Sequence, residues 1–147
     1  SSMAAVVTLK YVPLEERRIL LISRDGEVID LGEHFLPSST VSQISYLNWS
    51  PNSRYLALIE DEEQEIHLLI YDAIEQGFIF RCPITGFQYG PSALFWSPDN
   101  QHIAYVGYDN DPLEVLDLNR GEVFALKKNA IAVGWSNTYP IVWPSGQ

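Results

Sequence analysis

The stretch LFWSPDNQHIAY, residues 94–105, decides the fold of this chain. The same pattern occurs earlier as LNWSPNSRYLAL, residues 47–58, and a shortened copy follows as VGWSN, residues 133–137. The tryptophans of the three copies are 47 and then 39 residues apart (49 to 96 and 96 to 135). A repeat period near forty residues is typical of β-propellers, in which each repeat forms one blade. The spacing therefore predicts an array of propeller blades.

Both full copies are typical of two β-strands joined by a tight turn. Pro51 and Pro98 fix φ at the first central position of a turn, and the Asn or Asp after each proline hydrogen-bonds to the local backbone. The flanking runs are β-branched and aromatic, and both faces of each strand carry apolar side chains, as in a sheet packed between two others. We therefore assign a structural role, with the tryptophans as wedges between blades, to Trp49, Ser50, Pro51, Trp96, Ser97, Pro98 and Trp135.

The segment before the first full copy is predicted to be an incomplete repeat. Residues 6–31 contain three strand candidates and a tight turn at Asp25-Gly26. The run Asp25-Gly26-Glu27-Val28 resembles Arg120-Gly121-Glu122-Val123, which follows the third strand of the second full copy. This register assigns the opening strands as the second, third and fourth of a repeat whose first strand is absent.

The whole chain is expected to be all-β, with about twelve or thirteen strands in four-stranded antiparallel sheets. No segment keeps the apolar spacing of three and four residues that indicates a helix. We expect one propeller-type domain over residues 3–147, with the incomplete blade at 6–31, full blades at 41–82 and 92–127, and terminal strands within 131–143.

The composition excludes several classes of partner. The chain carries 9 Lys and Arg against 19 Asp and Glu, a net charge of −10, which argues against binding to nucleic acid or to an anionic membrane. No apolar run approaches the roughly 20 residues of a membrane span. No secretory leader is recognisable, with a sequence that lacks its native start as the alternative interpretation. Ser1-Ser2 is typical of a tag remnant, which makes Met3 the candidate native start. The single cysteine, Cys82, excludes an internal disulfide and is expected to be packed, which favours a reducing cytoplasm while leaving the compartment open.

The two full copies resemble the Trp-Ser-Pro-Asp-Gly type of propeller repeat. That type is the TolB-like relative of the WD repeat and also occurs in the propeller domains of prolyl-oligopeptidase-type enzymes. The resemblance covers roughly residues 41–143 and includes Asp72 and Asp117 late in the third strands. Ser53 and Asn100 stand where the family has glycine, and the last copy has Asn in place of proline. The resemblance implies a rigid disc for protein or ligand binding, and it leaves the activity open because propellers host many functions.

Few residues carry a signal of catalysis or ligand binding. No Gly-x-Ser-x-Gly nucleophile motif and no phosphate-binding glycine loop occur. His34, His67 and His102 lack the spacing of metal ligands, and His67 is expected on a strand surface. The run Asp109–Asp111 resembles part of a calcium loop but lacks its Gly and distal Glu, so a plain hairpin tip is favoured over calcium. The acidic run Glu60–Glu65 is interpreted as a solvated hairpin tip, with docking of a basic partner as the alternative. We expect no cofactor and no metal.

Two functions of different class remain open. The first is a non-catalytic interaction or scaffold module. The second is a ligand-binding, sugar-binding or hydrolytic site built from the loops on one propeller face. Such a site should gather carboxylates and aromatic side chains on the connections between blades. Those connections, residues 34–40, 85–91 and 128–130, hold few acids, which favours the first function and argues against an enzyme.

The strand count bears on assembly, because propellers typically need four to eight blades to close. We expect two chains to form a six-bladed ring with two-fold symmetry, in which the tail strand of each completes the opening blade of the other. The alternative is that the chain is part of a longer propeller or half of a hetero-assembly. Residues expected at or near the junctions of the ring are Val7, Leu9, Ile131, Val133 and Trp135.

Overall fold

The computed structural model describes residues 3–7, 19–31, 43–62, 65–84, 94–106, 112–128, 130–136 and 139–144. These residues form thirteen β-strands and no α-helix, which confirms the prediction of an all-β chain. The strands are β1 (Met3–Val7), β2 (Ile19–Ser23), β3 (Val28–Asp30), β4 (Gln43–Trp49), β5 (Tyr55–Glu62), β6 (Glu65–Asp72), β7 (Gly77–Ile84), β8 (Leu94–Trp96), β9 (His102–Val106), β10 (Pro112–Asp117), β11 (Glu122–Lys128), β12 (Ala130–Ser136) and β13 (Tyr139–Pro144).

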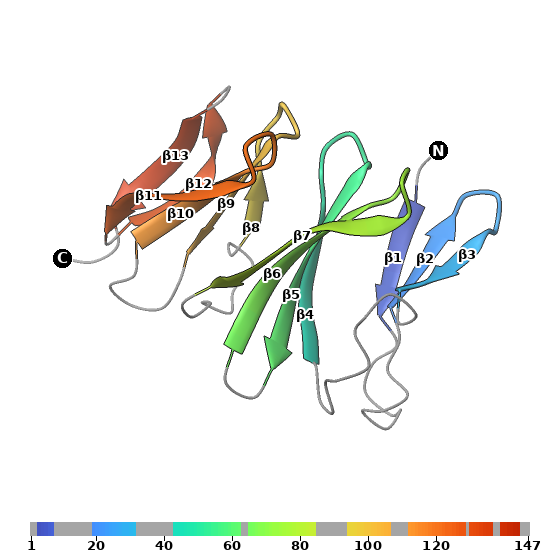
Figure 1. The fold of residues 1–147 in the computed structure, drawn as a ribbon. Helices are drawn as coiled ribbons and strands as arrows, with labels where there is room; N and C mark the ends of the chain where they lie inside the picture. The colour runs from blue at the N-terminus through green and yellow to red at the C-terminus, as the bar shows by residue number, and fades with distance from the viewer. Residues whose placement is uncertain are drawn as a thin grey trace.

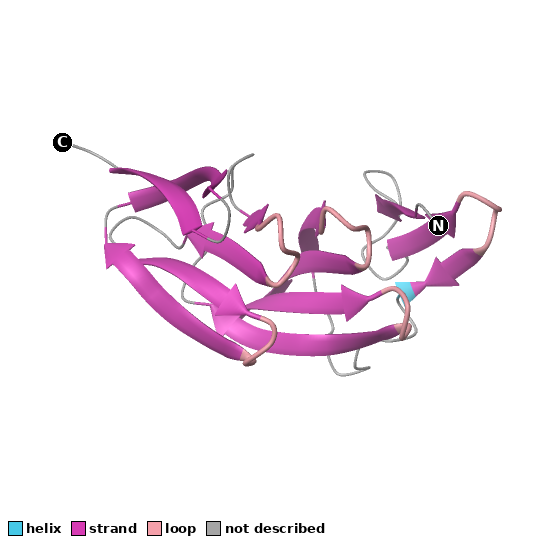
Figure 2. Cartoon of the chain, turned by 90° about the horizontal axis from the view of Figure 1, so that it is seen from above, coloured by secondary structure: helices cyan, strands magenta, loops and turns pink. Residues whose placement is uncertain are grey.

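The strands form four antiparallel sheets that follow one another along the chain (Figure 1). The sheets contain β1–β3, β4–β7, β8–β11 and β12–β13, and neighbours in sequence are neighbours in each sheet. Figure 2 shows the sheets fanned along a curved arc, with the opening sheet at the N-terminal end and the β12–β13 sheet at the other end. No strand pairing joins these two end sheets within the described residues. The arrangement is therefore an open arc of blade-like sheets.

The hairpin turns contain residues in the left-handed backbone conformation, and only some of these residues are of a type that favours it. Ser53 (φ 59°) and Asn100 (φ 62°) occupy matching places in the two Trp-Ser-Pro turns, where the resembling repeats carry glycine. Asparagine tolerates this conformation better than serine does. After the third strands, Gln76 (φ 53°) and Gly121 (φ 65°) also match each other. The second repeat thus has the lower backbone strain at both turns, because glycine and asparagine adopt positive φ more easily.

The two central sheets bury apolar side chains on both faces. Along β5, Leu56 and Leu58 pack toward the opening sheet, whereas Ala57 and Ile59 pack toward β8–β11. Complete burial of one large aliphatic side chain stabilises a fold by about 1.5–3 kcal/mol. The core between β4–β7 and β8–β11 is the largest, and its buried residues are Ala57, Ile59, Leu68, Ile70, Ile84, Leu94, Trp96, Ile103, Tyr105 and Leu116. The core against the opening sheet contains Ile19, Leu21, Leu31, Leu56, Leu58, Leu69 and Tyr71.

Two charged positions differ from the sequence-based expectation. Glu60 is only 3% exposed and His67 only 4%, although Glu60 was assigned to a solvated tip and His67 to a strand surface. The acidic run is not a free tip over its whole length, because β5 continues through it and pairs Glu60 with His67. Both side chains therefore lie inside a sheet that is covered by neighbouring sheets. Glu65 fits the solvated interpretation, with its side chain 68% exposed, and the side chains of residues 61–64 lie outside the described part of the chain.

No helix that could cross a membrane occurs in the described part of the chain.

Candidate functional site

The first Trp-Ser-Pro hairpin is held by the side chains of Ser50 and Asn52. The hydroxyl of Ser50 accepts a hydrogen bond from the backbone amide of Tyr55 (2.9 Å) and donates one to the side-chain oxygen of Asn52 (2.7 Å). That oxygen also accepts the amide of Arg54 at 3.0 Å. The turn is thus closed by its own polar side chains, as the sequence motif predicts.

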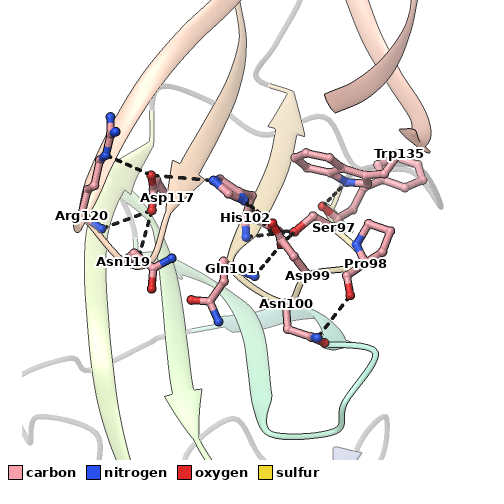
Figure 3. Close-up of polar contacts among 11 residues, drawn as sticks. Ser97, Pro98, Asp99, Asn100, Gln101, His102, Asp117, Asn119, Arg120 and Trp135 are labelled. Carbon is pink, nitrogen blue, oxygen red and sulfur yellow. Dashed lines mark hydrogen bonds and ion pairs between the residues drawn. The ribbon is translucent and has the colours of Figure 1, made fainter. Parts of the chain in front are cut away.

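The second hairpin repeats this arrangement with ionisable residues (Figure 3). The hydroxyl of Ser97 accepts the amide of His102 (3.0 Å), and Asp99 accepts the hydroxyl of Ser97 and the amide of Gln101 (2.9 Å). The ring Nδ1 of His102 lies 3.0 Å from the Asp99 carboxylate. Burial alone would raise the pKa of Asp99, but the hydrogen bonds from Ser97 and Gln101 and the nearby His102 lower it below its ordinary value.

A second turn closes each sheet at the end of its third strand. Asp72 accepts the backbone amides of Ile74 (2.9 Å) and Glu75 (3.3 Å), and Asp117 accepts the amides at 119 (2.9 Å) and 120 (3.2 Å). Backbone bonds of 2.8 Å join this turn to the Trp-Ser-Pro turn in both sheets. The two turns of one sheet therefore form a single clasp at one end of the blade.

A basic side chain joins the two turns in each clasp. The guanidinium of Arg54 donates to Asp72 at 2.7 and 3.0 Å, whereas His102 places Nε2 3.7 Å from the carboxylate of Asp117. Burial acts to raise the pKa of Asp72, but the bonds from Arg54 and the backbone outweigh burial and lower that pKa. The clasp of the first full repeat is thus held by a charge-assisted pair with two hydrogen bonds.

Tryptophans join successive sheets through one repeated hydrogen bond. The indole Nε1 of Trp96 donates to the backbone oxygen of Asn48 at 2.9 Å, and that of Trp135 donates to the backbone oxygen of Phe95 at 2.9 Å. In both cases the acceptor is the residue just before the tryptophan of the preceding copy. The ring of Trp96 also stacks on Tyr55 across the same interface, with centroids 6.1 Å apart. The wedge role predicted for these tryptophans is therefore a specific bond as well as apolar packing.

Trp49 departs from this pattern. Its ring packs on the core between the opening sheet and β4–β7. Within the described part of the chain, its indole Nε1 is buried and has no hydrogen-bond partner. The matching donors of Trp96 and Trp135 are both satisfied. A buried donor without an acceptor costs about 1–3 kcal/mol.

The Ser97–Asp99–His102 group has the residue types of a hydrolase triad, but its order is different. A nucleophilic serine needs the histidine between the hydroxyl and the carboxylate, so that the ring accepts the hydroxyl proton. Here the carboxylate of Asp99 lies between Ser97 and His102, and Ser97 is fully buried. The first hairpin reaches the same geometry with an asparagine and no base. The arrangement therefore closes a turn and provides no activated nucleophile.

A second polar cluster, which the sequence did not predict, lies in the sheet β4–β7. Arg81 on β7 reaches the buried carboxylate of Glu60 at 3.2 Å and the ring Nδ1 of His67 at 3.3 Å. His67 in turn places Nε2 3.4 Å from the exposed Glu65. Arg81 partly neutralises the buried Glu60, which satisfies the requirement that a buried charge be paired. β5 and β6 pair in a register that sets Glu60 opposite His67. Finding this cluster from the sequence would have required that register.

The remaining expected residues have simpler positions. Pro51 and Pro98 are exposed at the hairpin turns, and Cys82 packs against the central core, where burial raises the pKa of its thiol to about 11. The described residues contain no group of three or more His, Cys, Asp or Glu side chains that could hold a metal ion. Among the other residues named from the sequence, Val7 lies in β1 and Ile131 and Val133 lie in β12, whereas Leu9, His34 and residues 109–111 lie outside the described residues.

Comparison with known proteins supports the fold and leaves the activity open. No protein-family model matches the chain, and no curated protein matches its sequence. One similar solved structure is TolB from Acinetobacter baumannii, with a TM-score of 0.57 and 18% sequence identity, and the match covers 91% of this chain and 33% of that chain. Another is an oligogalacturonate lyase in complex with manganese, with a TM-score of 0.54 and 15% sequence identity, and the match covers 76% of this chain and 29% of that chain. The chain thus spans about a third of these proteins. At this identity the likeness shows a TolB-like β-propeller fold and nothing of function.

Proposed function

We propose that this chain is a non-catalytic β-propeller interaction module that associates with a second copy of itself. The observation that carries the proposal is the open arc, in which a three-stranded sheet at one end and a two-stranded sheet at the other flank two four-stranded sheets. Propellers typically close with four to eight blades. Two such arcs joined end to end supply enough strands for a six-bladed ring, whereas one arc leaves sheet edges open to further pairing.

The polar groups support a module without catalysis. The Ser97, Asp99 and His102 side chains are committed to closing a hairpin. The buried Glu60 and His67 are paired through Arg81 inside one sheet. The two clasps share the same geometry although their side chains differ. This supports a role for the clasps in keeping the blade ends rigid.

Light scattering on the purified chain tests self-association. A single chain has a mass of 16.7 kDa, so the proposal predicts a species of twice that mass that dissociates on dilution. A species of 16.7 kDa at every concentration up to the millimolar range would contradict it. A heterologous partner would then be the better hypothesis for the open ends.

A loop-built ligand site is the second candidate. It is favoured by one observation, that a structural neighbour of this fold is an oligogalacturonate lyase in complex with manganese. Thermal unfolding in the presence of oligogalacturonates and Mn²⁺ tests it, because a ligand that binds the folded state raises the unfolding midpoint by an amount that grows with the logarithm of its concentration relative to its Kd. The interaction-module proposal predicts an unchanged midpoint, and a concentration-dependent rise would favour the ligand site.

A further inference from the structure

The opening sheet matches the second, third and fourth strands of a full blade. β2 and β3 are joined by a turn with Gly26 at positive φ (85°), as the third and fourth strands of the second full repeat, β10 and β11, are joined by a turn with Gly121 at positive φ (65°). Ile19 and Leu21 of β2 also pack toward the following sheet, as Leu68 and Ile70 of the third strand β6 do. β2 and β3 therefore correspond to third and fourth strands, and β1, which pairs with β2, corresponds to β5 and β9. β4 and β8 are the first strands of their sheets, each paired with the second strand, and we call this first strand the innermost strand of a blade. No described strand lies in that position beside β1.

The unsatisfied indole of Trp49 indicates what belongs in that place. Trp96 and Trp135 each donate to a backbone oxygen on the innermost strand of the preceding sheet. For Trp49 the preceding sheet is β1–β3, in which no described strand occupies the innermost place. By this pattern, the acceptor for Trp49 would be a backbone carbonyl on a strand that pairs antiparallel with β1. The carbonyl would belong to the residue just before the tryptophan of that strand.

The two ends of the arc also present matching apolar faces. In β2, Ile19 and Leu21 are buried against β4–β7, so Leu20 and Ile22 point to the opposite face, where Val28 opposite Ile22 is 56% exposed. This outer face has no described sheet packed on it.

At the other end, Phe124 on β11 is 43% exposed and lies opposite Val115, whose side chain faces the β12–β13 sheet. The matching residue of the preceding sheet, Phe80, packs against the next sheet. Phe124 and the neighbouring Leu126, 45% exposed, therefore lie where third and fourth strands of the tail sheet would cover them.

We propose that β12 of a second copy pairs with β1, and that its Gly134 carbonyl accepts the indole N–H of Trp49. This inference rests on the proposed self-association and specifies its geometry. β12 fits because it carries the Trp-Ser motif, and Gly134 precedes Trp135 as Asn48 precedes Trp49. β12 with the partner's β1–β3 makes one four-stranded blade, whose outer strands then cover Phe124 and Leu126.

The exchange displaces β13. In the single chain, β13 occupies the edge of β12 from Ala130 opposite Pro144 to Ser136 opposite Tyr139. The partner's β1 takes that edge in the dimer, so one strand pairing replaces another. The gain comes from the Trp49 bond and from burial of the two apolar faces. A direct pairing of β13 with β1 would build a sheet of five strands and leave Trp49 without its acceptor.

The indole signals of the full chain, labelled with ¹⁵N-tryptophan, test the proposal by NMR over a dilution series. We expect the Trp49 signal to move downfield and to become protected from solvent exchange as the dimer forms, while the Trp96 signal stays in place. A dimer with an unchanged Trp49 signal would overturn the strand exchange and leave self-association standing. A chain that stays monomeric at all concentrations would overturn both.

Matched tryptophan variants give a second readout. Trp49→Phe keeps an aromatic ring and removes the N–H, so the dimer Kd should rise about five-fold for each of the two symmetric bonds, with the monomer's unfolding midpoint unchanged or raised. Trp96→Phe is the control, because its bond to Asn48 lies within one chain and its loss lowers the midpoint. An unchanged Kd in Trp49→Phe would contradict the proposal.

A variant in β13 separates exchange from edge-to-edge pairing. Val142 pairs with Ala132, and Val142→Pro weakens the β12–β13 ladder within the full chain. If β1 of the partner replaces β13, this variant lowers the dimer Kd. If β13 itself is the joining strand, the variant raises the dimer Kd and the proposal is wrong.

Discussion

The two full Trp-Ser-Pro repeats build the same clasp from different side chains. In the first, the turn is closed by Ser50 and Asn52, and Arg54 holds Asp72 through two charge-assisted bonds. In the second, Ser97 and an ionised Asp99 close the turn, and His102 lies between two carboxylates. The serine hydroxyl and the backbone bonds are common to both. The comparison teaches that the hydroxyl fixes the geometry, while the charges around it set how each clasp responds to pH.

The largest expected difference between the repeats is at their tryptophans. Trp96 is 8% exposed and hydrogen-bonded across the interface, so Trp96→Ala should destabilise the fold by about 3–5 kcal/mol, as for other buried aromatic residues. Trp49→Ala should cost less, because Trp49 is more exposed than Trp96 and its N–H has no acceptor among the described residues. Urea unfolding of both variants measures the difference. Equal losses of unfolding free energy in the two variants would show that the hydrogen bond of Trp96 and its deeper burial add little stability beyond that of Trp49.

Removal of the serine hydroxyls should give the next largest effect. Ser97→Ala leaves the half-buried amide of His102 and the Asp99 carboxylate without their shared partner, a loss of about 1–3 kcal/mol. Ser50→Ala should cost toward the lower end of that range, since its acceptor Asn52 is neutral. Chemical denaturation compares the two. A stability unchanged in both variants would show that the backbone alone closes the turns.

Acid should weaken the clasps in a predictable direction. The pKa values of Asp72 and Asp99 are both lower in the folded chain than their ordinary value of 3.8. A lowered folded-state pKa contributes stability that is present above the unfolded pKa and is lost as pH falls through the folded one. Unfolding free energy should therefore decline as pH falls below about 4, and Asp99→Asn should make that decline shallower. A slope equal to that of the unmodified chain would contradict the assignment of Asp99.

The smallest effect is expected at the acidic hairpin of β5 and β6. Neutralising Glu62, Glu63 and Glu65 should leave the unfolding midpoint nearly unchanged, because the sequence predicts a solvated tip for these acids, Glu65 is 68% exposed, and exposed charges contribute little. Glu60→Gln is the contrast, since it removes the charge that Arg81 pairs inside the sheet. A large loss of stability in the triple variant, or a bound cation lost with it, would show that these three acids form a site.

Much of the fold follows from local sequence signals. The Ser-Pro turn chemistry and the two-sided apolar strands predict the central hairpins, and the Asp25-Gly26 turn places a hairpin between β2 and β3. These features depend on residues close together in the chain. The number of strands, about twelve or thirteen from the sequence, agrees with the thirteen described.

The contacts that the sequence missed are all non-local. Burial of Glu60 depends on the strand register and on Arg81, which lies 21 residues away. A count of charges along the sequence does not reveal that Arg81 and Glu60 pair. Trp49 has no acceptor among the described residues, whereas Trp96 and Trp135 each donate to a backbone oxygen of the preceding sheet. The motif alone therefore predicts three equal tryptophans where the structure has two of one kind and one of another.

Small-angle X-ray scattering, measured in line with size-exclusion chromatography, tests most directly whether two arcs close into one ring. The proposal predicts a particle of twice 16.7 kDa whose pair-distance distribution is that of a compact disc. A particle of 16.7 kDa with the profile of an open arc, or a dimer with two separate maxima in that distribution, would contradict ring closure.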